Sequence, residues 1–341
     1  MNKAVLILNT KKNKLFDFLI SKISRSYDLK TFYLDDMTSF SRKKIILEIN
    51  NYITSNNIEY SFFQGCYISL IDYNFITKIK TKKKILFVSD DFDVHEVNII
   101  TAQACDIVLN ACPVSVLKYK EKQINCYYVP LEADNRILKN YNLKKDIDIL
   151  FFGKIKADRE FYLENLKKEN YILKIIGTNN ENLVSETELA KYISRSKIVI
   201  NFSQTGNKNK FYSHKTLPFN HYQFKGRVFM AGLCGTLCVS EISPGGKIIF
   251  NDICPVFSNY NEMLEIINKY LKNSNELINK TEIFCKKSME YSDDNYMPYI
   301  SEKINHCEIK KKINLKIPFW YSYIFFKKSI QLYFRGLKKK L

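Results

Sequence analysis

Apolar and polar positions alternate along the chain with two different periods. Short apolar runs typical of buried strands are separated by segments whose apolar residues recur every three or four positions, as in amphipathic helices. The helical spacing occurs at residues 14–24 and 43–54, and the apolar runs lie at residues 4–8, 29–34, 60–63, 85–88, 107–109 and 126–129. Strands that alternate with helices predict a parallel, doubly wound sheet, which binds ligands at the carboxyl ends of its strands.

The same alternation starts again after a polar segment at residues 130–145. Apolar runs at residues 147–152, 173–176 and 198–202 predict further strands, and helical patterns lie at residues 159–168, 187–194, 261–271 and 275–291. We therefore predict an α/β chain with two Rossmann-like, doubly wound domains, at residues 1–132 and 147–306. A linker at residues 133–146 joins them, and a basic, aromatic, helical tail occupies residues 307–341.

Residues 225–246 (KGRVFMAGLCGTLCVSEISPGG) contain the most informative pattern in the chain. They predict an amphipathic helix that stops at Gly235, a short apolar strand at residues 236–240, then Glu241 and a Pro-Gly-Gly turn that includes Gly245. A strand-end carboxylate can accept hydrogen bonds from ribose hydroxyls, and Arg227 at the helix start can hold a phosphate. The alternative is a helix-surface arginine and an acid in an ordinary turn.

The order Arg, x, Phe, Gly, then Glu before Pro-Gly resembles the donor-binding segment of CgeB-like (spore-maturation-protein-B-like) bacterial glycosyltransferases. That resemblance implies the GT-B architecture, in which two Rossmann-like domains face each other across a cleft. It extends over about residues 85–291 and is strongest from residue 148 onward. It implies a hexosyltransferase-type, metal-independent enzyme that moves a sugar from a nucleotide-sugar donor to a glycan or lipid-linked acceptor in cell-surface polysaccharide or glycoconjugate synthesis. No cofactor is expected besides the donor.

Two further segments supply candidate donor-binding residues. Residues 148–166 read as a buried strand, Gly153, a basic loop and a helix, a turn whose free N–H groups and cations suit a diphosphate. The candidates are Gly153, Lys154, Lys156, Arg159 and, near the end of the strand at residues 198–202, Asn201. The alternatives are an ordinary exposed loop in a lysine-rich chain and an asparagine bonded by loop backbone.

One position departs from the family pattern. Many glycosyltransferases of this architecture have Phe-Glu where this chain has Phe229-Met230, and that glutamate grips the donor ribose. Met230 cannot accept such a hydrogen bond. Either Glu241 takes that task, or donor recognition is altered, or the chain is a non-catalytic nucleotide- or glycan-binding relative. The retaining motif of two glutamates separated by seven residues is not expected either, because its earlier position is Tyr222.

The candidate catalytic residues follow the predicted strand at residues 85–88. Asp90, Asp91 and His95 would lie at the sheet edge, where one of them could take the proton of an acceptor hydroxyl. An Asp at this place can instead cap the next helix. The pair Asp91 and Asp93 has the spacing of a metal-binding motif from the other large glycosyltransferase architecture, but the twofold α/β alternation argues against it. His214 and His221 are expected on a loop surface, not at a zinc site.

The formal net charge of +18 is unevenly distributed. Residues 308–341 contain ten Lys or Arg and one acid, and aromatic residues are interleaved with them. Such a tail can be an interfacial membrane helix, a helix that packs back on the domains, or a surface that stacks on nucleic-acid bases. We expect peripheral contact with an anionic membrane through residues 309–341 and no nucleic-acid partner, because the charge is concentrated in the tail.

Other features of composition place the chain in the cytoplasm. No apolar run approaches the roughly 20 residues of a membrane-spanning helix, and the N-terminal run is too short for a signal peptide. The nine cysteines lie mostly in apolar runs without a Cys-x-x-Cys pair, so reduced core thiols are expected. The predicted location is cytoplasmic, with peripheral contact at the inner face of the cytoplasmic membrane.

Overall fold

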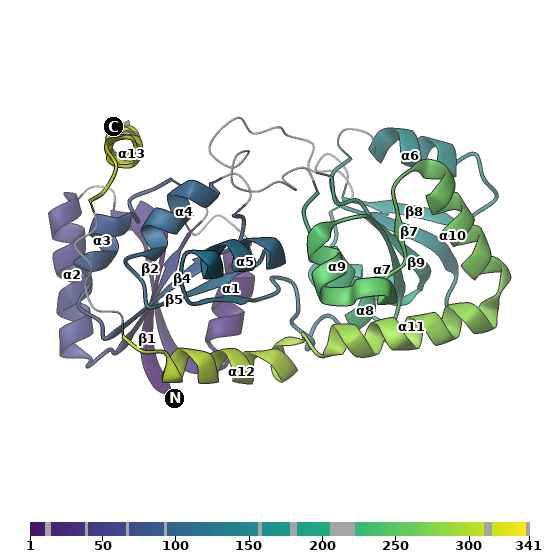
Figure 1. Cartoon of the computed structure of the whole chain (residues 1–341), viewed down its shortest axis with the longest axis horizontal. Helices are drawn as coiled ribbons and strands as arrows, with labels where there is room; N and C mark the ends of the chain where they lie inside the picture. The colour runs from purple at the N-terminus through teal and green to yellow at the C-terminus, as the bar shows by residue number, and fades with distance from the viewer. Residues whose placement is uncertain are drawn as a thin grey trace. The chain divides into compact units, whose positions relative to one another are not determined.

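The fold contains two parallel sheets, each within its own compact unit (Figure 1). The computed structural model describes residues 1–10, 15–37, 40–65, 68–91, 94–155, 159–177, 183–204, 222–309 and 316–338, without the side chains of residues 15–16 and 332–338. The described part of unit 1 lies within residues 1–131 and 298–338, and that of unit 2 within residues 132–204 and 222–297. The prediction of two doubly wound α/β domains is confirmed.

Unit 1 is built on a six-stranded sheet of order β2-β1-β3-β4-β5-β6, with every described pair parallel. Its strands are β1 (Asn2–Leu8), β2 (Tyr27–Tyr33), β3 (Tyr60–Gln64), β4 (Lys83–Val88), β5 (Ile107–Asn110) and β6 (Cys126–Tyr128). Helices α1 (Leu15–Ile23), α2 (Arg42–Ser55), α3 (Tyr73–Thr77), α4 (His95–Ala102) and α5 (Pro113–Glu121) and the 3-10 turn η1 (Leu34–Met37) connect the strands. The central strands are apolar and buried because helices cover both faces of the sheet (Figure 1).

Unit 2 is built on a five-stranded parallel sheet of order β11-β10-β9-β7-β8. Its strands are β7 (Ile147–Phe152), β8 (Leu173–Ile176), β9 (Ser196–Asn201), β10 (Leu237–Glu241) and β11 (Val256–Phe257). Its helices are α6 (Arg159–Leu166), α7 (Glu186–Ser194), α8 (Arg227–Leu233), α9 (Pro244–Phe250), α10 (Tyr260–Lys272) and α11 (Ser274–Met289), with a 3-10 turn η2 (Asn251–Ile253). The strand order reverses between β7 and β9, so the carboxyl ends of these two strands mark the place where such sheets bind ligands.

The structure corrects the Pro-Gly-Gly turn. Pro244 is the first residue of α9, and the Ser243 side chain caps this helix by accepting a hydrogen bond from the Gly246 amide at 3.1 Å. A proline suits the first helical position because the amide that it lacks would have no partner there. The two glycines therefore belong to a helix, and Glu241 is separated from it by two residues only.

The compact units end at other residues than the predicted domains. Helix α12 (Asp293–His306) begins in unit 2, but from Pro298 onward the chain belongs to unit 1, where the Lys83 ammonium caps the helix by donating to the carbonyl of Ile304 at 2.9 Å. The tail forms α13 (Phe319–Lys338), which also belongs to unit 1. The expected linker has no helix or strand, yet its Ala133 and Leu138 are buried and it belongs to unit 2. Among the described residues, no helix combines the length and the apolar character that crossing a membrane requires.

Candidate functional site

Five of the predicted donor-binding residues lie together at the carboxyl edge of the unit 2 sheet. Gly153 follows β7, Asn201 ends β9 and Glu241 ends β10, while Arg159 starts α6 and Arg227 starts α8. Parallel strands bring their carboxyl ends to one edge, which explains why residues distant in the sequence meet here.

The backbone at position 153 has a conformation that favours glycine. Its φ is +116°, a conformation that side chains with a Cβ rarely adopt, and its amide donates to the Ile176 carbonyl at 2.9 Å. Gly177 follows the neighbouring strand β8, has a φ of +79° and lies against Gly153. A Cβ at position 153 would lie 3.5 Å from the Arg227 guanidinium, so the guanidinium rests directly on this turn.

Arg227 is the central cation of the site. Its guanidinium lies over the Phe151 ring, 5.8 Å from the centroid, and donates a long hydrogen bond of 3.4 Å to the Asn201 side-chain oxygen. The Asn201 amide in turn donates to the Ser240 hydroxyl at 2.9 Å. Loss of hydration, together with repulsion from Arg159, lowers the pKa of Arg227 to about 10, so the group is still charged at neutral pH.

Arg159 is a second buried cation. Its guanidinium donates to the carbonyls of Lys154 at 2.8 Å and Gln204 at 2.9 Å, while its Nε is buried without a hydrogen-bond partner. Burial lowers the pKa of Arg159, and the nearby charge of Glu241 opposes this shift. Within the described ranges neither guanidinium is ion-paired with a carboxylate, although the charge of Glu132 attracts Arg227 as that of Glu241 attracts Arg159. Two partly dehydrated cations that repel each other would both be stabilised by an anion.

Glu241 holds the loop that follows β9. Its Oε2 accepts hydrogen bonds from the amides of Ser203 and Gln204, both at 2.7 Å, and its carbonyl accepts from the Ser203 hydroxyl at 2.9 Å. Because the Gln204 carbonyl accepts from Arg159, Glu241 also supports the position of that guanidinium. In this arrangement the Glu241 carboxylate binds backbone amides of the protein.

For the other residues singled out in the sequence, the structure gives the burial of the side chain. The Lys154 side chain is exposed, and Gly245 is buried in the first turn of α9. Met230 lies inside α8 with 7% of its surface exposed. Lys156, His214 and His221 lie outside the described residues.

In unit 1, Asp91 and His95 form the centre of a buried polar cluster. The Asp91 carboxylate bonds the His95 imidazole, and it accepts hydrogen bonds from the Asn98 amide at 2.8 Å and the Tyr119 hydroxyl at 3.1 Å. Burial disfavours the ionised carboxyl, but the His95 imidazole and the hydrogen bonds prevail and hold the pKa of Asp91 below its usual value. Both side chains are at most 1% exposed, so they are enclosed by protein, whereas the neighbouring Asp90 is partly exposed.

The structure tests one alternative for this segment, an Asp that caps the next helix. The N-cap of α4 is Val94, which provides no side-chain hydrogen bond, so Asp91 does not cap the helix as expected of a strand-end Asp. Asp93 lies outside the described residues. Within the described ranges, no group of three or more His, Cys, Asp or Glu is arranged to hold a metal ion.

Several residues of the unit 2 edge were not predicted from the sequence. They are Phe151 beneath Arg227, Gly177 beside Gly153, and Ser203 and Gln204, which link Glu241 to Arg159. Gly177 had a signal, because it follows an apolar run as Gly153 does. Ser203 and Gln204 bind the Glu241 carboxylate through their backbone amides, and the sequence has no signal for that.

One protein-family model matches part of the chain, mostly within unit 2. Residues 155–282 match the family model described as Glycosyl transferase-like, and this segment includes Arg159, Asn201, Arg227 and Glu241. No curated protein has a significant sequence match to the chain.

Solved structures show the same fold at very low sequence identity. HepE of Anabaena in complex with UDP is 9% identical with a TM-score of 0.57, and the match covers 89% of this chain and 99% of that one. Sucrose-phosphate synthase from Thermosynechococcus elongatus is 8% identical with a TM-score of 0.56, over 89% and 98% of the two chains. An α-glucosyltransferase in complex with UDP and a 13-mer DNA is 11% identical with a TM-score of 0.53, over 89% and 99%. The fold of this chain is therefore that of the GT-B glycosyltransferases.

Proposed function

We propose that this protein is a glycosyltransferase that uses a nucleoside-diphosphate sugar bound at the carboxyl edge of the unit 2 sheet. The observation that carries the proposal is the pair of guanidiniums, Arg159 and Arg227, beside the Gly153 turn without an ion-paired carboxylate among the described residues. The Glycosyl transferase-like match over residues 155–282 supports the same reaction class.

In this proposal the two arginines stabilise the leaving group. The bond between the anomeric carbon of the sugar and a diphosphate oxygen breaks, and an acceptor hydroxyl oxygen forms the new bond to that carbon. Negative charge then accumulates on the nucleoside diphosphate, where fixed cations are most effective in a partly dehydrated site. Arg227 and Arg159 would do what a metal ion does elsewhere, so activity is expected to persist in EDTA.

The acceptor proton needs a base, and among the three residues predicted for this role the exposure favours Asp90. Asp91 and His95 are enclosed, and their hydrogen bonds are made to each other and to Asn98 and Tyr119. Asp90 is partly exposed at the end of β4. A glycan or lipid-linked hydroxyl is the proposed acceptor class, in keeping with the CgeB-like resemblance.

UDP is the first nucleotide to test, because two of the structures with this fold contain it. Thermal unfolding of the full chain would be followed with UDP, GDP, dTDP, ADP and CMP, each with and without EDTA. A ligand at 100 times its dissociation constant adds about 2.7 kcal/mol, which raises the midpoint of a unit of this size by roughly 5 °C. We expect such a shift with one diphosphate, unchanged by EDTA.

Substitutions at the two arginines test whether the rise of the unfolding midpoint comes from binding at this site. Arg227→Gln and Arg159→Gln each remove a charge-assisted contact of about 1.5–3 kcal/mol, so affinity should fall by roughly 10- to 100-fold. Arg195→Gln is the matched control, because Arg195 is an arginine of unit 2 that pairs with Asp146 on the surface. Equal affinity in all three variants, or no shift with any nucleotide, would refute this donor site.

A non-catalytic nucleotide-binding protein is the second candidate, and Met230 favours it. The residue is buried in α8 and has no oxygen to bind a ribose hydroxyl, and the Oε2 of Glu241 bonds loop backbone. Release of free nucleoside diphosphate from a panel of nucleotide sugars separates the two functions. Binding without release would support the second, and release above the rate of the Arg227→Gln variant would support the transferase.

A further inference from the structure

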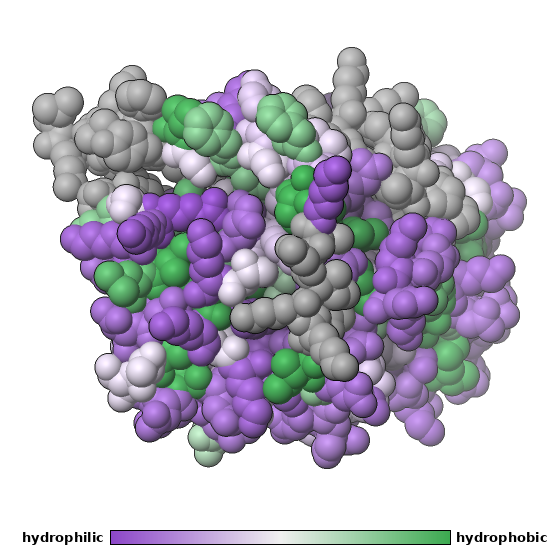
Figure 2. Space-filling view, turned by 60° about the vertical axis from the view of Figure 1, so that its left-hand side comes forward, coloured by the Kyte–Doolittle hydropathy of each residue, from purple (hydrophilic) through white to green (hydrophobic). Residues whose placement is uncertain are grey.

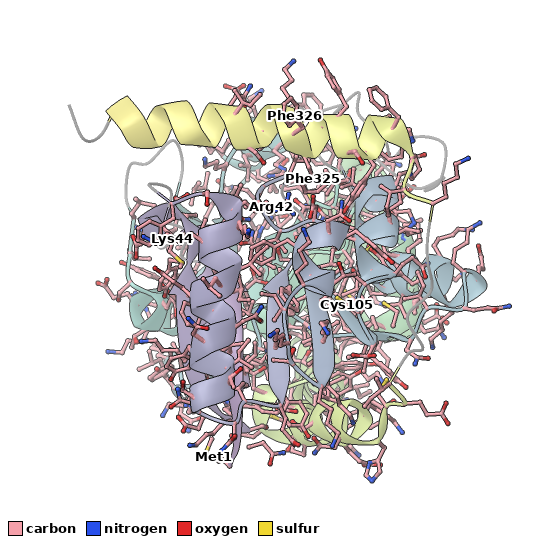
Figure 3. All side chains as sticks on the ribbon, turned by 90° about the vertical axis from the view of Figure 1, so that its left-hand side faces the viewer. Met1, Arg42, Lys44, Cys105, Phe325 and Phe326 are labelled. Carbon is pink, nitrogen blue, oxygen red and sulfur yellow. The ribbon has the colours of Figure 1, made fainter. Side chains whose placement is uncertain are left out.

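Helix α13 has two apolar faces, of which one packs on unit 1 and the other points away from it. Figure 3 shows Phe325 on the side of the helix toward the body of unit 1, and Phe326 directed away from it. The exposures agree, because Phe325 is 2% exposed and Phe326 is 63% exposed. A C-terminal helix that only packed back on the domain would need the first face and not the second.

The packed face fixes the rotation of the helix. Tyr321 and Phe325 join Val97 of α4 in a buried cluster. The Tyr321 hydroxyl accepts from the Tyr73 amide at 2.9 Å and bonds the Thr101 hydroxyl at 2.8 Å. These contacts hold the helix by hydrogen bonds as well as by apolar packing, so the direction of the opposite face is determined by the fold.

The outward face carries a continuous apolar stripe. Phe319, Tyr323, Phe326 and Ile330 are 83%, 52%, 63% and 42% exposed. Their spacing of four, three and four residues places them on one line along a helix, and the rings of Phe319 and Tyr323 are stacked, with centroids 6.2 Å apart. In Figure 2, green side chains interrupt the purple surface along the upper edge, where α13 runs. Contiguous exposed apolar surface of this kind indicates a binding site.

Cations accompany the stripe. Lys316 and Lys327 are exposed, Lys328 is half-buried, and residues 309–341 contain ten Lys or Arg without a single Asp or Glu. Each cation near an anionic lipid surface adds about 1 kcal/mol of attraction, or roughly fivefold in affinity. A partner of neutral surface would gain nothing from this charge.

We propose that the stripe Phe319, Tyr323, Phe326 and Ile330 docks unit 1 on an anionic lipid bilayer. The helix lies in the plane of the interface, with these four side chains between the headgroups and the acyl boundary and the lysines at headgroup level. Aromatic rings flanked by lysines are the composition that suits this layer. The inference is independent of the proposed glycosyl transfer, since it involves residues of unit 1 only.

Vesicle flotation of the full chain tests the proposal. The neutral vesicles contain phosphatidylcholine alone. The anionic vesicles contain phosphatidylcholine with about 30 mol% phosphatidylglycerol. We expect binding to the anionic vesicles that is at least tenfold tighter than to the neutral ones. The stripe variant Tyr323→Ser/Phe326→Ser should weaken it by about tenfold or more. The charge variant Lys316→Gln/Lys327→Gln, at two exposed lysines, should weaken it by up to about 25-fold.

A matched control has the same kind of change at another exposed apolar pair. Ile278→Ser/Ile283→Ser removes two side chains of α11 that are each 53% exposed, and it should leave vesicle binding unchanged. Circular dichroism and the midpoint of unfolding verify that each variant is folded.

Three results would overturn the proposal. The first is equal affinity for neutral and anionic vesicles. The second is binding to anionic vesicles that is unchanged in the stripe variant. The third is a chain that does not bind vesicles and instead dimerises or binds duplex DNA through the same stripe. Light scattering and a DNA titration with the same variants detect the last case.

Discussion

The buried carboxylate of Asp91 offers a sharp test of the structure, because the sequence suggests a catalytic role and the burial suggests a structural one. Replacing Asp91 with Ala removes an acceptor used by three buried or half-buried donors, those of His95, Asn98 and Tyr119. Each buried donor that loses its acceptor costs about 1–3 kcal/mol, so the three together cost at least about 3–5 kcal/mol. Unit 1 should therefore lose about that much free energy of unfolding.

The assay is urea unfolding of the full chain at pH 7, followed by far-UV circular dichroism and a thermal midpoint. A loss of about 3–5 kcal/mol corresponds to a fall of roughly 6–20 °C in a unit of this size. The matched control is Asp90→Ala, since Asp90 is adjacent in sequence but partly exposed, and a surface change typically costs about 0.5 kcal/mol. A fall below about 1 kcal/mol for Asp91→Ala, together with lost turnover in a folded protein, would refute the structural role.

The same group predicts a pH dependence. The pKa of Asp91 is held below its unfolded value, so the folded state binds fewer protons than the unfolded chain around that value. Its contribution to stability is then present at neutral pH and is lost as the pH falls through the folded-state pKa. The stability difference between the natural chain and the Asp91→Asn variant should shrink in acid, and a difference that stays constant from pH 7 to pH 3 would contradict this assignment.

Three other changes have expected outcomes. Gly153→Ala forces a Cβ onto a backbone with φ of +116° and should cost about 1–3 kcal/mol of unfolding free energy and weaken nucleotide binding, as measured by urea titration and calorimetry. Lys145→Met removes an ammonium that donates to the carbonyls of Ser196 and Gly235 at 2.7 and 2.8 Å, and should cost about 2–3 kcal/mol by urea titration. Tyr321→Phe removes the hydroxyl that fixes α13 and should cost about 1–3 kcal/mol and increase amide hydrogen exchange in that helix. Stability equal to that of the natural chain in any of these variants would contradict the contacts given for it.

The carboxyl edge of the unit 2 sheet could be predicted because the pattern that indicates it is local in the sequence. Each strand is an apolar run, and the residue after the run is then at the ligand-binding edge. Gly153, Asn201 and Glu241 were found in this way, and the alternation of strands and helices gave the parallel sheets.

The features that the sequence did not predict depend on packing between distant segments. Asp91 is enclosed because Asn98 and Tyr119 come from two helices that cover it, and no local pattern reports that. Pro244 with two glycines is compatible with a turn and with a helix start, and the Ser243 cap decides between them. The tail is recognisably amphipathic, but which of its aromatic residues pack depends on the position of α4.

The exchange at Met230 concerns only one part of a nucleotide-sugar site. A ribose carboxylate contributes specificity for two hydroxyls, whereas the arginines act on a diphosphate that carries most of the charge of the donor. Under the proposed function, Arg227 and Arg159 would be the cationic part, connected to the unit 2 sheet through Asn201 and Gln204, and Met230 would stand where the resemblance expects the ribose carboxylate. Under the proposed function, Arg227, held by Asn201, and Arg159, held by two loop carbonyls, suit a diphosphate, and the nucleoside would be recognised by contacts other than the usual carboxylate.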